Sequence, residues 1–165
     1  MPEKETLERA KRAKRRGKSA STQSGEFVRE EMHHIREGKH GARSTKQAIA
    51  IGLSKARRAG VKLPPPPRGK VSEKTRRSAE RAYHLGQRGQ TKTSRRRSRA
   101  RERVLKREGR SAASRTALAR QARSAARRRT RAARSAAARR AVRTKGHKGL
   151  SAAARKAART RARRG

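Results

Sequence analysis

The sequence contains no cysteine and no tryptophan, and all 11 of its acidic residues are glutamates. Without cysteine, disulfide scaffolds, thiolate metal sites and cysteine nucleophiles are excluded. The aromatic residues amount to one phenylalanine and one tyrosine, and alanine dominates the 30% of residues that are hydrophobic. Larger apolar side chains are therefore too few for one core spanning 165 residues. We expect no enzyme and no cofactor.

Negative charge is also scarce, because 53 Lys and Arg face only 11 acids and the net charge is +42 at pH 7. Such a chain needs a polyanionic partner. Low hydrophobicity with high net charge is typical of chains that cannot offset their ordering entropy by burial. We therefore expect a mainly α protein with extensive disorder, made of a small antiparallel helical hairpin and a long basic Ala/Arg-rich tail that is helical in part or when bound.

The chain also lacks any apolar run long enough for a membrane span or a signal-peptide core. Together with the missing cysteines, this predicts an intracellular protein without a membrane span. We expect it in the cytoplasm, associated with the nucleoid.

Charge and hydrophobicity are distributed unevenly along the chain. Residues 1–88 have a net charge of +15, whereas residues 89–165 have 29 basic residues, two glutamates and a net charge of +27. The larger apolar residues gather within 26–63 instead. These trends predict five segments: a basic N-terminal segment (1–23), a helical hairpin (24–63), a proline-rich linker (64–71), a short helix (72–86) and a basic Ala/Arg-rich tail (87–165).

The first hairpin helix is predicted to begin at Ser24, whose side chain can cap it. Val28, Met32 and Ile35 follow at spacings of four and three residues and define an apolar side. Several charged side chains, Glu30 among them, are expected on the opposite, exposed side. A shorter helix before this one, in the segment ETLERAKRAKRRGK (residues 5–18), is expected to stop at Gly17 and to fray.

The second hairpin helix has the clearest local signals. Ser44 and Gln47 form a capping box. Small residues at i, i+4 spacing (Ala48, Gly52 and Ala56) allow another helix to approach closely. Ile51 lies off the apolar stripe, which would leave apolar surface for a partner.

Residues 25–66, GEFVREEMHHIREGKHGARSTKQAIAIGLSKARRAGVKLPPP, resemble an uncharacterised family of small bacterial proteins with a KQAIAI-x-LS-x-ARRAG helix. The resemblance implies no activity, because the function of that family is not established. The tail is similar in composition to the Ala/basic-rich tails of linker histones and bacterial histone-like proteins. It differs from them in its preference for arginine.

Residues 111–144 contain no proline or glycine, are bracketed by Gly109 and by the pair Gly146 and Gly149, and would form one long helix. On that helix five arginines at spacings of 3, 4, 4 and 3 share one face: Arg120, Arg123, Arg127, Arg131 and Arg134. A merely solvated charged face would mix signs, whereas negative partners are absent here. The planar guanidinium fork suits bidentate contact with phosphate.

These observations predict sequence-nonspecific DNA binding and compaction by a bacterial histone-like protein of a nucleoid or plasmid. The predicted phosphate-binding residues are Arg95, Arg96, Arg97, Arg120, Arg123, Arg127, Arg128, Arg131, Arg134, Arg139, Arg140, Arg155, Arg159 and Arg163. A secondary basic patch is predicted at Lys39, Arg43, Lys55, Arg57 and Arg58. RNA or ribosome binding is an open alternative. So is a protein-interaction module, in which residues 24–63 self-associate or bind a protein and the tail is a polyanion anchor.

One cluster of side chains resembles a metal or acid/base site: Glu30, His33, His34, Glu37 and His40. Because HEXXH and cysteine-containing patterns are missing, we interpret these as surface histidines beside glutamates and expect no metal. Ser78 and Ser98 each follow arginines, as in basic-directed phosphorylation sites, and their modification is left open. Pro64–Pro67 are expected to form a rigid spacer that separates the hairpin from the rest of the chain.

Overall fold

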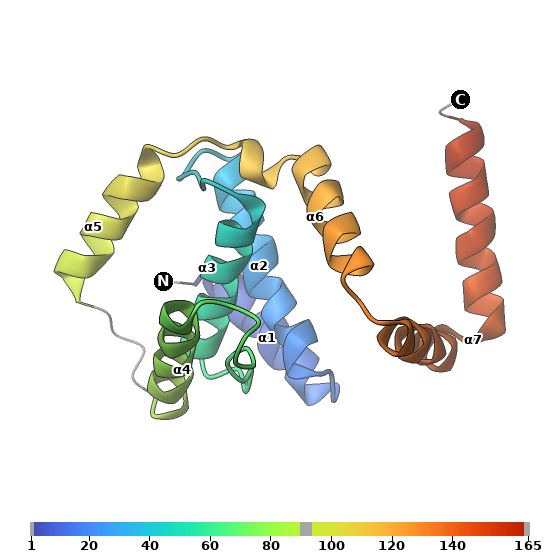
Figure 1. The fold of residues 1–165 in the computed structure, drawn as a ribbon, viewed down its shortest axis with the longest axis horizontal. Coiled ribbons are helices and arrows are strands. Elements are labelled where there is room, and N and C mark those ends of the chain that lie inside the picture. Colours follow the sequence, from blue (N-terminus) through green and yellow to red (C-terminus); the bar gives the residue numbers. More distant parts are fainter. Residues whose placement is uncertain (1, 90–93, 164–165) are drawn as a thin grey trace. The chain divides into compact units, whose positions relative to one another are not determined.

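The computed structural model describes residues 2–89 and 94–163, and within them every regular element is helical (Figure 1). The prediction of a mainly α protein is confirmed. The elements are α1 (Lys4–Arg15), α2 (Ala20–Arg36), α3 (Thr45–Arg58), α4 (Glu73–Gln87), α5 (Arg95–Lys106), the short 3-10 helix η1 (Ser111–Ala113), α6 (Arg115–Arg127) and α7 (Arg131–Ala162). Of the predicted tail, residues 90–93 and 164–165 lie outside the described residues.

Extensive disorder, which we expected for the tail, is not supported. The tail forms α5, α6 and α7, although none of these helices buries a residue. Local sequence accounts for them, because alanine has the highest helix propensity and hydroxyl side chains cap two of the helices. Ser114 accepts a hydrogen bond from the amide of Ala117 at 3.2 Å, and Thr130 accepts one from Ala133 at 3.2 Å. The composition argument failed because it considered burial alone.

The chain divides into two compact units, Met1–Gln121 and Ala122–Gly165, which we call the N-terminal and C-terminal units. The N-terminal unit is built on the hairpin of α2 and α3 (Figure 1). Ala48, near the start of α3, packs with Met32 and Ile35, and Ala56, near its end, packs with Phe27. The two helices therefore run antiparallel, as the sequence predicts.

The capping predictions for the hairpin have different outcomes. Ser44 accepts the amide of Gln47 at 3.2 Å, but the Gln47 side chain returns to the amide of Arg43, at 2.8 Å, rather than to Ser44. The Ser24 cap is wrong, because α2 begins four residues earlier with Ser19 as its cap. Ser24 lies inside the helix, fully buried, and donates its hydroxyl to the Ala20 carbonyl at 2.8 Å.

Two more helices pack against the hairpin. Ala10 and Leu7 of α1 join the cluster around Phe27, so α1 is part of the core. Helix α4 packs on α3, and its Ala79 and Ala82 are buried. We expected the proline segment to separate the hairpin from the following helix. Instead, the chain returns after the prolines and α4 packs on the hairpin.

Part of the predicted tail also belongs to the N-terminal unit. The amides of Gly41 and Ala42 in the α2–α3 loop donate to the carbonyls of Leu105 and Gly109 at 2.9 and 3.0 Å. The hydroxyl of Thr45 donates to the Ala112 carbonyl at 2.7 Å. Side chains of η1 and of α6 then complete the cluster around Met32 and Ile35: Ala112, Ala113 and Leu118.

The C-terminal unit consists of the end of α6 and the long helix α7. Gly146 interrupts α7 with a φ of 64° and a ψ of 172°, so the helix has two halves that meet at a kink. We predicted a helix end at this glycine from the sequence. Among the described helices, none combines the length and the apolar character that crossing a membrane requires.

Candidate nucleic-acid interface

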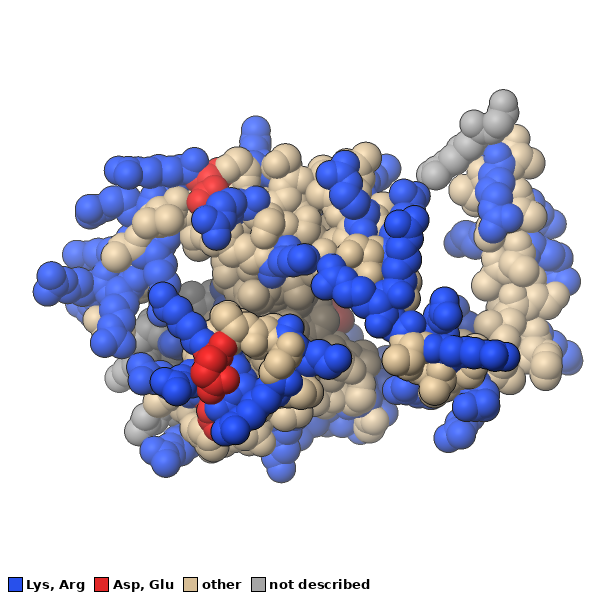
Figure 2. Space-filling view, in the orientation of Figure 1, with Lys and Arg blue, Asp and Glu red and all other residues tan. Residues whose placement is uncertain are grey.

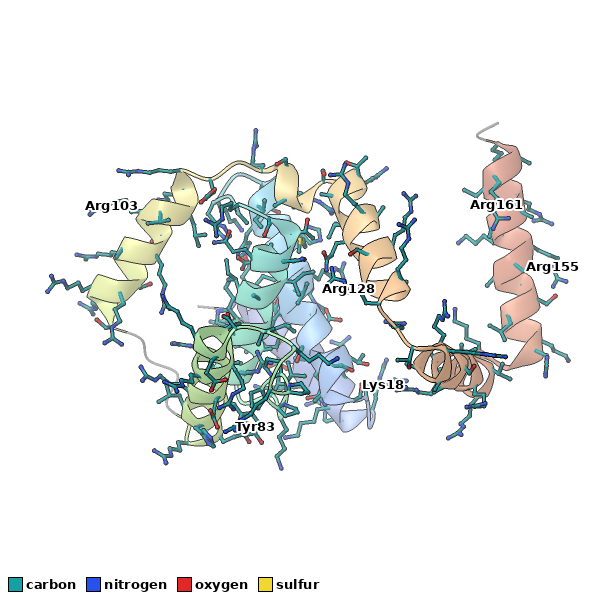
Figure 3. The ribbon with its side chains drawn as sticks, in the orientation of Figure 1. Lys18, Tyr83, Arg103, Arg128, Arg155 and Arg161 are labelled. Carbon is teal, nitrogen blue, oxygen red and sulfur yellow. The ribbon has the colours of Figure 1, made fainter. Side chains whose placement is uncertain are left out.

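The 14 arginines predicted to bind phosphate are all exposed. Most of them lie on α5, α6 and α7, the three helices of the segment predicted as a tail, so the helical geometry fixes their spacing. Figure 3 shows side chains of this kind projecting outward from α7, where Arg155 and Arg161 are labelled. Their positions are Arg95, Arg96 and Arg97 on α5; Arg120, Arg123 and Arg127 on α6; Arg128 between α6 and α7; Arg131, Arg134, Arg139, Arg140, Arg155 and Arg159 on α7; and Arg163 at its C-cap.

The predicted stripe of five arginines on one helix is wrong. Helix α6 ends at Arg127 and α7 begins at Arg131, so three of the arginines lie on one helix and two on another. One feature of the sequence explains the break: Thr130 caps a new helix, because its hydroxyl accepts the amide of Ala133.

The 14 arginines have no acidic partners among the described residues. Glu108 is the last acidic residue of the chain, and within residues 2–89 and 94–163 none of the 14 arginines forms an ion pair. Helix α4 shows the contrast, because its Arg76 pairs with Glu73 at 2.9 Å and the hydrogen bond raises the pKa of Arg76. On the face drawn in Figure 2, basic side chains cover α5, α6 and α7, and acidic ones are few. Helices α6 and α7 therefore carry uncompensated positive charge.

The secondary basic patch does not form one free surface. Lys39 pairs with Glu3 at 3.2 Å and with Glu37 at 3.1 Å. Arg57 is buried, with 7% of its surface exposed, and its guanidinium donates to the carbonyls of Leu63 and Pro64, both at 3.1 Å. Burial lowers the pKa of Arg57. Lys39 is therefore engaged in surface ion pairs, and Arg57 is part of the packed fold.

The other three residues of the patch also differ in their exposure and contacts. Lys55 is half-buried and contacts Glu31 at 2.7 Å and Glu30 at 3.4 Å. Arg58 is half-buried, and burial first, then the charge of Arg101, lowers its pKa. Arg43 is exposed. The patch therefore does not form one basic surface, and helices α5–α7 remain the candidate interface.

A second group of polar residues is buried beside the α2–α3 loop. Glu31 is fully buried, and Glu30 is 3% exposed, although we expected Glu30 on the solvent side. His34 and His40 have only 12% and 14% of their side chains exposed, so they are not the surface histidines we predicted. One ligand atom from each of Glu31, His34 and His40 lies within 4.8 Å of the others. We call these three residues the Glu31 cluster.

The N-terminus of α1 closes over this cluster. Glu3 accepts hydrogen bonds from His34 at 2.8 Å and from Lys39 at 3.2 Å. These bonds, that from His34 first, hold the pKa of Glu3 below its ordinary value. The sequence has one signal for the cluster, namely that Glu31 and His34 lie one turn apart on the side of α2 that also presents Ile35. The predicted cluster contained His34 and His40 but had Glu30 and Glu37 as its carboxylates, so Glu31 was missed.

Comparison with known proteins finds a match to one protein family, whose function is unknown. Residues 4–67 match the model of a family described as a family of unknown function (DUF6496). The matched range covers α1 to α3, the Glu31 cluster and the prolines, and it ends before α5. The resemblance to an uncharacterised family over residues 25–66 falls within it. No curated protein and no solved structure matches the chain.

Proposed function

We propose that this protein binds DNA without sequence specificity and compacts it, through phosphate contacts of the arginines on α5, α6 and α7. The observation that carries the proposal is that all 14 of these arginines are exposed and that none of them forms an ion pair within the described residues. Guanidinium groups in this state bind phosphate oxygens bidentately, and the release of condensed counterions from the duplex supplies most of the affinity.

The breaks between these helices suit a polyanion that is longer than any one of them. Helix α6 and the two halves of α7 are joined at residues 128–130 and at Gly146. Each helix is thus a separate basic arm that can contact its own set of phosphates. Compaction follows if the arms of one chain contact different segments of DNA. The role is that of a histone-like protein of a bacterial nucleoid or plasmid, in the cytoplasm.

Lack of specificity is supported by the residue types on these arms. Base recognition in the major groove uses a few fixed side chains of one docked helix, often with acidic or amide groups among them. Helices α6 and α7 consist mainly of arginine, lysine, alanine and small hydroxyl residues, and their amide and acidic side chains amount to Gln121 alone. Such a surface reads backbone charge, not base edges.

The alternative of a protein-interaction module loses its motivating feature. Ile51 was expected to leave apolar surface uncovered, but it is half-buried. RNA remains the chemical competitor for the same arginines, because its phosphates offer the same contacts. The test therefore includes an RNA duplex.

The test is the salt dependence of duplex binding by the full chain and by a variant in which six arginines of α7 become glutamine. These are Arg131, Arg134, Arg139, Arg140, Arg155 and Arg159. Glutamine keeps helix propensity and removes the charge. For six to ten contacted phosphates the slope of log K against log[salt] is about −5 to −9, and the variant loses about 0.9 for each contact removed.

The matched control replaces the same six arginines with lysine, which keeps the charge and is expected to keep the slope. Scrambled duplexes of equal length are expected to bind alike. A shallow slope for the wild type, an unchanged slope for the glutamine variant, or discrimination of several kcal/mol between sequences contradicts nonspecific phosphate binding. A preference of more than about tenfold for an RNA duplex over DNA of equal length (about 1.4 kcal/mol) assigns the arms to RNA instead.

A further inference from the structure

We propose that the Glu31 cluster is a binding site for one divalent first-row transition-metal ion of the zinc type, with Glu31, His34 and His40 as its ligands. Two imidazoles and one carboxylate are a ligand set that such ions favour. The site is independent of the arginine helices. It lies where α2, the α2–α3 loop, α3 and the N-terminus of α1 meet.

The buried carboxylate supplies the first argument. Glu31 has no exposed surface, yet its Oε1 has no hydrogen-bond partner among the described residues. A buried charge without such partners is costly. The ammonium of Lys55 lies 2.7 Å from Oε2, which offsets part of the charge on that side. The Oε1 atom faces the ring of His40 and is left for a cation.

The tautomers of the histidines supply the second argument. Nδ1 of His40 lies 3.0 Å from the carbonyl oxygen of Gly41, which can only accept, so Nδ1 carries a proton. In the neutral ring Nε2 then has a lone pair, and it lies 3.3 Å from Glu31 Oε1. Two acceptors face each other across this distance. A proton or a metal ion has to lie between them.

The distance itself favours a metal ion. Tetrahedral zinc binds imidazole nitrogen and carboxylate oxygen at about 2.0–2.1 Å, which places two ligand atoms about 3.3 Å apart. The 3.3 Å between Glu31 and His40 already satisfies this spacing. The ligand atom of His34 lies within 4.8 Å of the other two, so a shift of His34 toward them completes the set.

The surroundings resemble the second layer of a metal site. Metal-bound histidines usually donate their other ring N–H to a carbonyl or carboxylate, which fixes their orientation. His40 does so to Gly41 and His34 to Glu3. The region is also acidic in a chain of net charge +42, because four of its 11 glutamates gather here: Glu3, Glu30, Glu31 and Glu37.

The experiment titrates chelator-treated full-length protein with Zn²⁺ by calorimetry and follows the thermal unfolding of the same samples. We expect one equivalent of tight binding and a rise in the midpoint of unfolding, since the ion binds only the folded state. His40→Ala, a change in a loop, is expected to weaken binding at least tenfold and to abolish the rise. The matched control is His33→Ala, which removes an exposed neighbour of His34 and is expected to change neither.

A second variant guards against misfolding. Glu31→Gln keeps the shape of the carboxylate and is expected to weaken Zn²⁺ binding at least tenfold; circular dichroism shows whether its helices persist. If Glu31→Gln unfolds, the comparison of His40→Ala with His33→Ala decides alone. Equal Zn²⁺ binding by the wild type and His40→Ala, or none by either, overturns the site. In that case His40 and Glu31 share a proton in a hydrogen bond between Nε2 and Oε1.

Discussion

Gly52 of α3 lies so close to Val28 of α2 that a Cβ atom on Gly52 would stand 2.7 Å from the Cα of Val28. It would also stand 3.0 Å from the carbonyl oxygen of Phe27. Both contacts are with backbone atoms, so no side-chain rotation can relieve them. The small-residue stripe of α3, predicted from the sequence, is confirmed here as the reason that the two hairpin helices approach closely.

We therefore expect Gly52→Ala to destabilise the N-terminal unit. Strain from overpacking is about 1–3 kcal/mol, and it outweighs the gain of about 1 kcal/mol in helix propensity. The matched control is Gly25→Ala in α2, where a Cβ would meet nothing within 4 Å. That variant is expected to raise the free energy of unfolding by about 0.5–1 kcal/mol. Urea unfolding measures both, and equal signs for the two variants contradict the close packing.

Features set by neighbouring residues could be predicted from the sequence. The stop of the first helix at Gly17, the Ser44 cap and the small stripe of α3 each depend on residues a few positions apart. The partners of buried polar groups could not be predicted. Glu31 meets Lys55 and His40, and Arg57 meets Pro64, through turns of the chain whose geometry no local pattern contains.

The candidate interface shows the same division. Composition indicated which residues carry free positive charge, and the structure places all 14 of the predicted arginines on the surface. Their arrangement was predicted as one stripe because residues 111–144 lack proline and glycine. The break instead comes from a threonine cap after three arginines. Absence of helix breakers does not make a helix continuous when a capping residue lies inside it.

Arg57 belongs to the fold and not to the interface, and a substitution can show this. Arg57→Met keeps most of the apolar stem and removes the hydrogen bonds to Leu63 and Pro64. We expect a loss of about 2 kcal/mol in the free energy of unfolding, because each bond from a charged group contributes about 1.5–3 kcal/mol and the carbonyls regain some water. Duplex affinity is expected to stay within twofold.

Arg58→Met is the control for this variant. The neighbouring Arg58 is half-buried, and none of the side-chain hydrogen bonds among the described residues involves it. We expect a smaller loss of stability than for Arg57→Met, measured by urea unfolding. Unchanged stability of Arg57→Met together with a large loss of duplex affinity would return Arg57 to the predicted basic patch.

Glu3 makes the attachment of α1 dependent on pH. Hydrogen bonds from His34 and Lys39 lower its pKa in the folded protein below the ordinary 4.5. A group whose pKa is lowered on folding stabilises the fold above the unfolded value, and this contribution is lost as the pH falls through the folded value. The wild type is therefore expected to exceed Glu3→Gln in unfolding midpoint at pH 6, and the difference is expected to shrink below pH 4.5.

The comparison is made in the presence of a chelator, so that metal binding at the neighbouring cluster does not contribute. Glu8→Gln is the control, because Glu8 is exposed on α1 and pairs only with Lys11, at 3.1 Å, on the same helix. Its effect is expected to be small at either pH. A difference between the wild type and Glu3→Gln that is constant from pH 6 to pH 3 contradicts the role of the ionised carboxylate.

Thr130 is expected to decide where α7 begins. Its hydroxyl accepts the amide of Ala133 at 3.2 Å, and replacing such a cap with alanine removes about 1 kcal/mol of helix stability. Thr130→Ala is therefore expected to increase amide hydrogen exchange in the first turn of α7 about fivefold. Thr144→Ala is the control: Thr144 lies inside α7 and only donates to the Arg140 carbonyl, at 2.9 Å. Alanine there is expected to leave exchange unchanged or to slow it.

The opposite outcome for Thr130→Ala would contradict the break between α6 and α7. If this variant slows exchange through residues 128–133, α6 and α7 form one continuous helix when the cap at position 130 is removed. The five arginines from Arg120 to Arg134 then share one face, and the phosphate contacts form along a single stripe instead of separate arms.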